Sequence, residues 1–177
     1  MDELSRLLGR VTAGIRPEYI RLPIDGGPAV YRERVYCYEL YHQMRLEWPD
    51  DGPFRLNGEV DKAGHPRLGP LGASRYKPDL LVHGPGNMGF NHAVIEVKSM
   101  MANATGIKKD LNTLRLFRRV VGYERSISLI YGEPPMDRVI ERVNNAAVGL
   151  PELPHIEVWV HCGLGEPAEH LFSLGRP

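Results

Sequence analysis

The sequence predicts one α/β domain, a three-layer sandwich in which helices flank a mixed β-sheet. The chain has 177 residues, 42% of them hydrophobic, which is enough to form a single core. Residues 78–83 and 92–98 alternate as β-strands do, and the Gly-rich segment between them is typical of a hairpin turn. An amphipathic helix over residues 107–121 then leads to an apolar strand at 126–131, and such a crossover makes that strand parallel to its neighbour.

The segments before the hairpin predict two helices and one further strand. A short helix is expected over residues 2–10, followed by a loop over 16–29 with an extended piece at 19–22. Residues 31–48 form the strongest amphipathic helix of the first half. Residues 54–62, FRLNGEVDK, are expected to form a strand that ends in the turn AGHP, so that three strands precede the crossover helix.

The C-terminal part is expected to extend this core, which covers about residues 31–131 of a single domain. Two prolines open a third helix over residues 134–148, and a last strand follows at 155–161, so that residues 132–162 add one helix and one strand. The remainder, residues 163–177, contains Gly and Pro and is expected to be irregular. The inward side of the third helix is expected to consist of Met136, Val139, Ile140 and Val143.

Composition and charge narrow the classes of function. Lys and Arg together number 22, as do Asp and Glu, so the chain lacks the strongly basic balance that usually marks nucleic-acid-binding domains, although local basic patches are compatible with it. Cys37 and Cys162 lie far apart without a metal-binding spacing, which favours a reduced, cytoplasmic setting. The N-terminal MDELSRLLGR has no signal-peptide apolar region, and no apolar run approaches the ~18 residues of a membrane span.

Charged side chains interrupt the two hairpin strands. On the second strand Glu96 and Lys98 share a face with Val94, and on the first strand Asp79 shares a face with Leu81. Burying a charge costs several kcal/mol unless the charge is paired or binds a metal. The pattern therefore indicates a functional cluster. A surface strand whose Glu96 and Lys98 face water is the alternative interpretation.

The helix over residues 31–48 brings a further acid toward the sheet. At about 100° per residue, Glu33 falls in the middle of the apolar side of this helix. Glu39 lies roughly a third of a turn away by the same geometry. We therefore expect Glu33 to face the body of the protein and Glu39, its rival, to face the edge. An alternative for Glu33 is a first-turn acid that the helix dipole favours.

Together these side chains predict a metal-assisted hydrolytic site. Carboxylates from Asp79, Glu96 and Glu33 would form a hard oxygen site of the kind that suits Mg²⁺. A metal in such a site polarises a phosphoryl oxygen and lowers the pKa of a bound water. The ammonium group of Lys98 would orient or activate that water, or stabilise developing negative charge. The predicted reaction class is hydrolysis of a phosphodiester.

The sequence PD at 78–79 followed by EVK at 96–98 resembles the signature of the PD-(D/E)XK nuclease superfamily. The predicted order of helix, three strands, helix and strand is similar to the restriction-endonuclease-like αβββαβ core of that superfamily. The resemblance covers about residues 31–131 and extends to small bacterial members that consist of little more than this core. It implies a magnesium-dependent nuclease, with Mn²⁺ able to substitute, that acts on DNA in preference to RNA.

The resemblance also implies a role for each residue of the motif. Asp79 and Glu96 would bind Mg²⁺, with the backbone carbonyl of Val97 as a further ligand. Lys98 would serve the attacking water, and the acid of the first helix would be Glu33 or its rival.

A row of basic residues on the second amphipathic helix is a candidate nucleic-acid interface. The resemblance implies that this helix lines the substrate cleft. The row either tracks a phosphate backbone or forms an ordinary solvated face. It consists of Lys108, Arg115 and Arg119, with Arg118 beside them.

The chain leaves open whether the domain cuts its ligand. A non-catalytic nuclease-fold protein that binds nucleic acid or a protein partner is the alternative function. A homodimer, or a subunit whose catalytic or targeting partner is encoded separately, is equally compatible with the compact length. We expect no membrane partner.

Other candidates are weaker. His83 shares the face of Asp79 and lies either at the rim of the site or at an ordinary strand end. His161, Cys162 and His170 gather near the C-terminus, but a zinc site there lacks a fourth ligand. The GEVDK segment, although similar to the second half of the motif, precedes the PD strand and cannot complete it, and GPGNMG at residues 84–89 is a hairpin turn without the features of a phosphate loop.

Overall fold

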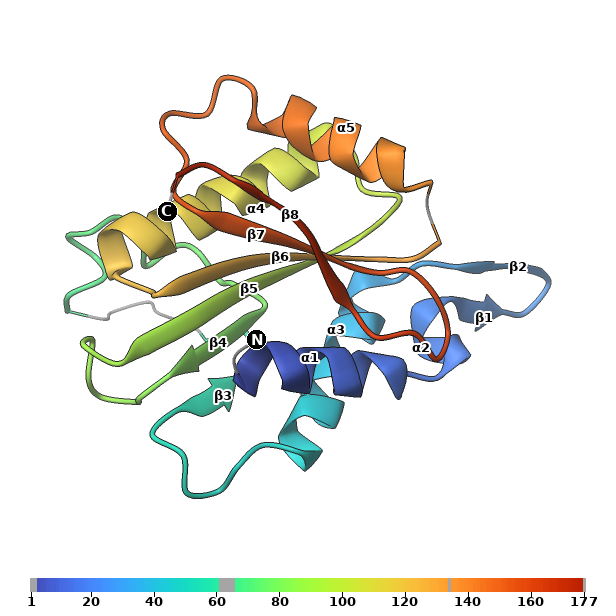
Figure 1. Cartoon of the computed structure of the whole chain (residues 1–177), viewed down its shortest axis with the longest axis horizontal. Coiled ribbons are helices and arrows are strands. Elements are labelled where there is room, and N and C mark those ends of the chain that lie inside the picture. Colours follow the sequence, from blue (N-terminus) through green and yellow to red (C-terminus); the bar gives the residue numbers. More distant parts are fainter. Residues whose placement is uncertain (1–2, 61–65, 134, 177) are drawn as a thin grey trace.

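The computed structural model describes residues 3–60, 66–133 and 135–176. Within them the chain alternates between helices and strands, which Figure 1 shows in chain order. The elements are α1 (Glu3–Ala13), α2 (Pro17–Ile20), β1 (Leu22–Ile24), β2 (Gly27–Val30), α3 (Glu33–Leu46), β3 (Arg55–Asn57), β4 (Leu80–His83), β5 (Asn91–Ser99), α4 (Ala104–Leu116), the π-helical turn η1 (Phe117–Val121), β6 (Arg125–Tyr131), α5 (Met136–Ala147), β7 (Ile156–His161) and β8 (Glu169–Leu174).

A six-stranded mixed sheet forms the centre of the molecule, in the order β3-β4-β5-β6-β7-β8. The pairs β3–β4, β4–β5 and β7–β8 are antiparallel, whereas β5–β6 and β6–β7 are parallel. The hairpin and the parallel crossover expected from the sequence are therefore confirmed. β1 and β2 form a separate two-stranded hairpin that projects beside α3 (Figure 1).

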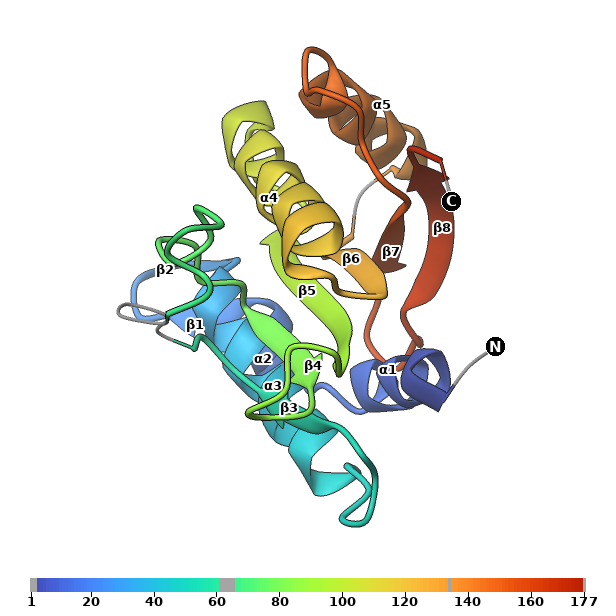
Figure 2. The same ribbon diagram turned by 90° about the vertical axis from the view of Figure 1, so that its left-hand side faces the viewer.

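Helices cover both faces of the sheet, as the alternation of apolar side chains predicts (Figure 2). One core packs α1 and α3 against the sheet face that carries Ala93, Ile95 and Val97. The other packs α4 and α5 against the opposite face, which carries Val94. Successive residues of β5 thus enter different cores, because strand side chains alternate in direction.

The expectation of an irregular tail over residues 163–177 is wrong for the described part. β8 pairs antiparallel with β7 and forms an edge of the sheet. Gly165 adopts a φ of 76°, which lets the chain turn back toward β7. The pairing satisfies the backbone groups along β7, and Leu171, Phe172 and Leu174 pack against the second core. Pro177 lies outside the described residues.

Several predicted boundaries also shift. The strand expected at 54–62 is confined to β3, and its last two residues lie outside the described part of the chain. The extended piece expected at 19–22 is instead the helix α2, which leads into β1, because Pro17 at the first helical turn favours a helix start.

The last two helices differ from expectation at their ends and on one face. α4 begins before residue 107 because the side chain of Asn103 caps it, accepting a hydrogen bond from the Gly106 amide at 2.9 Å. On α5, Ile140 was expected to face inward but is exposed. The buried residues of this helix are Val139, Val143 and Ala146, which follow the 3–4 residue spacing of one helix face. Residue 134, where this helix was expected to start, lies outside the described residues.

Within residues 3–60, 66–133 and 135–176, no helix has the length and apolar character needed to cross a membrane.

Candidate functional site

The hairpin strands place Asp79 beside Glu96. β4 and β5 pair with Leu80 opposite Ile95, so that Asp79, directly before β4, lies next to the second half of β5. One carboxylate oxygen of Asp79, Oδ2, accepts a hydrogen bond of 2.7 Å from the amide of Val97. A backbone hydrogen bond to a charged acceptor is short and directional, so it fixes the Asp79 side chain alongside β5.

Lys98 connects two helices to this part of the sheet. Its Nζ atom donates a hydrogen bond of 2.7 Å to Oε1 of Glu33, the first residue of α3, and forms an ion pair of 3.1 Å with Oδ2 of Asp110 on α4. The side chain of Lys98 is 17% exposed and that of Asp110 is 6% exposed. The structure therefore brings Glu33 and Lys98 together as the sequence predicts.

Asp110 is a member of this cluster that the sequence analysis missed. It is buried on α4, where its carboxylate meets the ammonium group of Lys98 from β5. The signal was present: Asp110 lies next to Leu111 and one turn before Leu114 in the buried stripe of the helix, where an acid is unexpected. We define the acid cluster as Glu33, Asp79, Glu96 and Asp110 together with Lys98.

The structure distinguishes the two acids of α3. Glu33 binds Lys98, whereas Glu39 accepts a hydrogen bond of 2.7 Å from Nε2 of Gln43, one turn along the same helix. The expectation that Glu39 faces an edge is wrong, because its exposure is only 9%. α1 and α2 pack against α3. Arg16, directly before α2, interacts electrostatically with Glu39.

Burial dominates the electrostatics of the carboxylates. Burial raises the pKa of Glu96 well above its usual range, and the charges of Asp79 and Asp110 raise it further. Burial also raises the pKa of Asp79, against the opposing effect of the hydrogen bond from Val97. For Asp110, burial raises the pKa to about 6, although the charge of Lys98 opposes this. The acid cluster is therefore costly to ionise fully without a cation.

Lys98 remains an ammonium ion at neutral pH. Burial alone would lower its pKa, but the hydrogen bond to Glu33 and the charge of Asp110 outweigh burial and raise the pKa above the ordinary value of 10.5. A protonated amine donates hydrogen bonds and cannot accept a proton. While these ion pairs persist, Lys98 is suited to stabilise negative charge or to hold a water molecule by donation.

The acid cluster contains four carboxylates and one ammonium group, which pairs with two of them, so the fully ionised cluster carries excess negative charge that a divalent cation would balance. Asp79, Glu96 and the carbonyl of Val97 supply hard oxygen donors. The Val97 carbonyl faces the same strand edge as its amide, which contacts Asp79. Among the described residues, no three His, Cys, Asp or Glu side chains form a ready-made metal site. An ion held here would keep several water ligands, as Mg²⁺ usually does.

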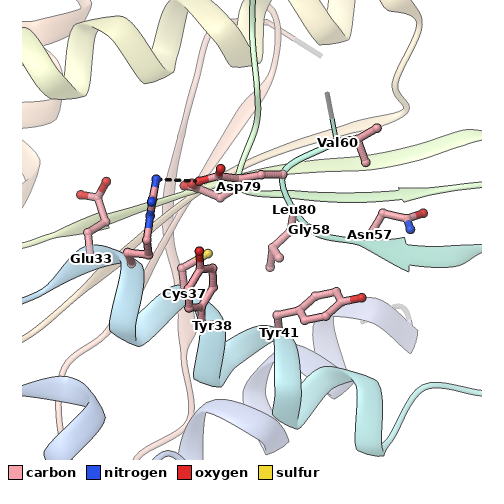
Figure 3. Close-up of a pocket in the computed structure, with 11 residues that line it drawn as sticks. Glu33, Cys37, Tyr38, Tyr41, Asn57, Gly58, Val60, Asp79 and Leu80 are labelled. Atoms are coloured by element: carbon pink, nitrogen blue, oxygen red, sulfur yellow. Dashed lines mark hydrogen bonds and ion pairs between the residues drawn. The ribbon is translucent and has the colours of Figure 1, made fainter. Parts of the chain in front are cut away.

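A cleft of about 550 Å³ opens beside the acid cluster, between α3 and the strands β3 and β4. Figure 3 shows Glu33 at one end of this cleft, Asp79 near its middle, and Tyr41 and Asn57 at the other end. Glu59 lines the cleft and forms an ion pair with Arg34 at 3.4 Å, so this residue of the GEVDK sequence lies near the acid cluster although it forms no part of the motif. The cleft gives solvent and ligands access to Asp79.

The basic row on α4 and η1 lies away from the acid cluster. Nζ of Lys108 donates a hydrogen bond of 3.1 Å to the carbonyl of Val148, and Arg119 forms an ion pair of 3.1 Å with Glu152. Lys108 and Asp110 are separated by about 200° around the helix. Arg115 follows the direction of Lys108 and donates to Oδ1 of Asn112 at 3.1 Å. A role of this row in nucleic-acid binding stays a prediction.

The weaker histidine candidates have ordinary partners. Nε2 of His83 lies 3.0 Å from Oδ1 of Asn57. In the buried His161, Nδ1 lies 2.8 Å from the hydroxyl oxygen of Tyr36 and Nε2 lies 2.9 Å from the carbonyl oxygen of Gly163. The carbonyl accepts from Nε2–H, which leaves Nδ1 to accept from the tyrosine hydroxyl. His161 is thereby engaged at both ring nitrogens within the fold.

Comparison of the chain with protein-family models, with curated proteins and with solved structures found no match.

Proposed function

We propose that this protein is a magnesium-dependent nuclease that hydrolyses phosphodiester bonds in DNA at a site of the PD-(D/E)XK type. The observation that carries the proposal is the acid cluster: Asp79, Glu96 and Lys98 share one sheet face, and Glu33 reaches Lys98 from α3. The element order α3, β3, β4, β5, α4, β6 supports it, because it matches the order expected for a restriction-endonuclease-like core.

The protein's own groups suit the handling of a cation and a water molecule. Asp79, Glu96 and the carbonyl of Val97 would hold Mg²⁺, with Mn²⁺ able to substitute. The bound metal would supply Lewis acidity and a water of lowered pKa. Lys98, as an ammonium ion, would donate a hydrogen bond to that water or to the oxygen that gains charge during the reaction.

The remaining two acids position Lys98. Glu33 contacts the lysine Nζ at 2.7 Å and Asp110 contacts it at 3.1 Å, from helices on opposite faces of the sheet. A lysine has a flexible four-carbon stem, and two anionic partners restrict its rotamers. Loss of either acid would therefore displace the ammonium group without removing a metal ligand.

Cleavage of DNA is the direct test. Supercoiled, linear and branched DNA are incubated with Mg²⁺ or Mn²⁺ and with wild-type protein, Asp79→Asn or Lys98→Ala. We expect cleavage by the wild type and a loss of about 10²-fold or more in each variant, the scale seen when one electrostatic donor is removed from an active site. Lys109→Ala, which removes an exposed lysine of α4, is the matched control and should cleave normally. Equal activity in all four proteins would refute the proposal.

A non-catalytic nuclease-fold protein that binds DNA is the second candidate. The observation that favours it is the internal pairing of Lys98, whose ammonium group already has two carboxylate partners. Titration of the protein with Mg²⁺ by calorimetry separates the candidates. Absence of metal binding together with intact DNA binding would favour the second.

A further inference from the structure

The cleft beside the acid cluster has an aromatic wall on one side. Tyr38 and Tyr41 lie on α3 with Arg34 and Cys37 at the spacing of one helix face, and all four line the cleft. Tyr38 is 60% exposed, so its ring is accessible to a ligand in the cleft. In Figure 3 Tyr38 and Tyr41 project from the helix toward the strand segments that form the opposite wall.

The opposite wall carries polar groups next to apolar ones. Asn57, Gly58 and Glu59 lie at the end of β3 and just after it, and Val60 and Leu80 line the same side. The side-chain oxygen of Asn57 lies 3.0 Å from Nε2 of His83, which leaves its amide N–H groups as donors for a ligand. An aromatic wall facing amide and carboxylate groups offers stacking on one side and hydrogen-bonding partners on the other.

The position of the cleft specifies what kind of ligand fits. Glu33 lies at one end of it and Asp79 near its middle, so a group bound in the cleft is adjacent to whatever lies over the acid cluster. Its volume of about 550 Å³ lies within the roughly 300–1,000 Å³ range of small-molecule sites. In a nucleic acid, the group next to a phosphodiester is a nucleoside. A base in a duplex is stacked and paired, so only an unpaired base can enter a cleft of this kind.

We propose that this cleft binds an unpaired nucleobase of the DNA strand whose phosphodiester lies over the acid cluster, with the base stacked on Tyr38. The inference rests on the proposed function and adds a substrate class to it: single-stranded DNA, or unpaired nucleotides beside a duplex. Stacking on an aromatic ring tolerates every base, so the site favours strandedness over sequence.

Equilibrium binding without metal tests the proposal separately from catalysis. Fluorescence anisotropy in EDTA measures the affinity of wild type, Tyr38→Ala and Tyr38→Phe for a labelled oligothymidine and for a duplex that contains the same strand. We expect the wild type to prefer the single strand. Because base stacking on an aromatic side chain is lost, Tyr38→Ala should weaken single-strand binding about fivefold or more, whereas Tyr38→Phe keeps the ring and the affinity.

Phe90→Ala is the matched control. Phe90 is 48% exposed, similar to Tyr38, but it lies in the turn between β4 and β5, at the end of β4 opposite Asp79. Its removal should leave single-strand affinity unchanged. Circular dichroism checks that Tyr38→Ala is folded, which we expect because the position is exposed.

The outcomes separate the two proposals. Unchanged single-strand affinity in folded Tyr38→Ala, or a duplex that binds as tightly as the single strand, would overturn the nucleobase site. Single-strand binding that depends on Tyr38, in a protein that cleaves no DNA with Mg²⁺ or Mn²⁺, would sustain the nucleobase site and refute the nuclease proposal alone.

Discussion

Asp110→Asn should make the metal-free protein less sensitive to pH. In the folded protein the pKa of Asp110 rises from the ordinary 3.8 to about 6, chiefly because the carboxyl is buried. Between these two pH values the folded state holds a proton that the unfolded chain has lost, so stability falls as the pH rises. One pKa unit corresponds to about 1.4 kcal/mol, and ionised Asp110 therefore costs the folded state about 3 kcal/mol relative to its protonated form.

Urea unfolding in EDTA across this pH range measures the effect. We expect wild type to lose about 3 kcal/mol more of its unfolding free energy than Asp110→Asn as the pH rises from below 4 to above 6, because asparagine does not titrate. Asp25→Asn, in the exposed turn of the β1–β2 hairpin, is the control and should follow the wild-type curve. Parallel curves for wild type and Asp110→Asn would refute the reasoning that burial, rather than the ion pair with Lys98, governs this carboxyl.

Three further predictions concern other parts of the molecule. Glu96→Gln should be more stable than wild type in EDTA at alkaline pH, where burial and neighbouring charges disfavour the ionised glutamate; urea unfolding checks this. Gly132→Ala should lower the unfolding free energy by roughly 2 kcal/mol, since Gly132 has a φ of 126° and an added Cβ would lie 2.7 Å from Cγ of Met100; thermal denaturation with refolding controls checks this. The double variant Lys108→Ala/Arg119→Ala should bind DNA more weakly. The plot of its log K against log [salt] should be less steep, by the amount expected for the loss of about two phosphate contacts. An unchanged slope would assign the row to the solvated surface.

The alternation of the hairpin strands was enough to predict which charged residues share a face. Asp79, Glu96 and Lys98 lie together because β4 and β5 pair in the register that the short Gly-rich turn allows. Local rules of strand geometry determine this placement, and no tertiary information was needed. The parallel pairing of β6 with β5 followed in the same way from the crossover helix.

Asp110 could not be assigned by such local rules. Its carboxylate meets Lys98 only because α4 packs across β5 at one particular height, which depends on the side chains of both elements. A helical projection shows an acid beside an apolar stripe but does not show what faces it. The same limitation explains Glu39, whose burial depends on the packing of α1 and α2 against α3.

β8 was missed for a different reason. The Gly and Pro content of residues 163–167 indicates a turn, and this signal was extended to the whole tail. The strand EHLFSL forms because its backbone pairs with β7 and its apolar side chains pack against the second core, and both partners exist only in the assembled sheet. The sequence of a strand does not by itself show which other strand it pairs with.

Binding of Mn²⁺ to the acid cluster tests the central claim most directly. Electron paramagnetic resonance of free Mn²⁺, titrated with wild type, Asp79→Asn, Glu96→Gln and the control Asp25→Asn, measures occupancy independently of any substrate. The account predicts a bound ion in wild type and in the control, and loss of that binding in the two cluster variants. Mn²⁺ that stays free in the presence of wild type, or that binds all four proteins alike, would contradict it.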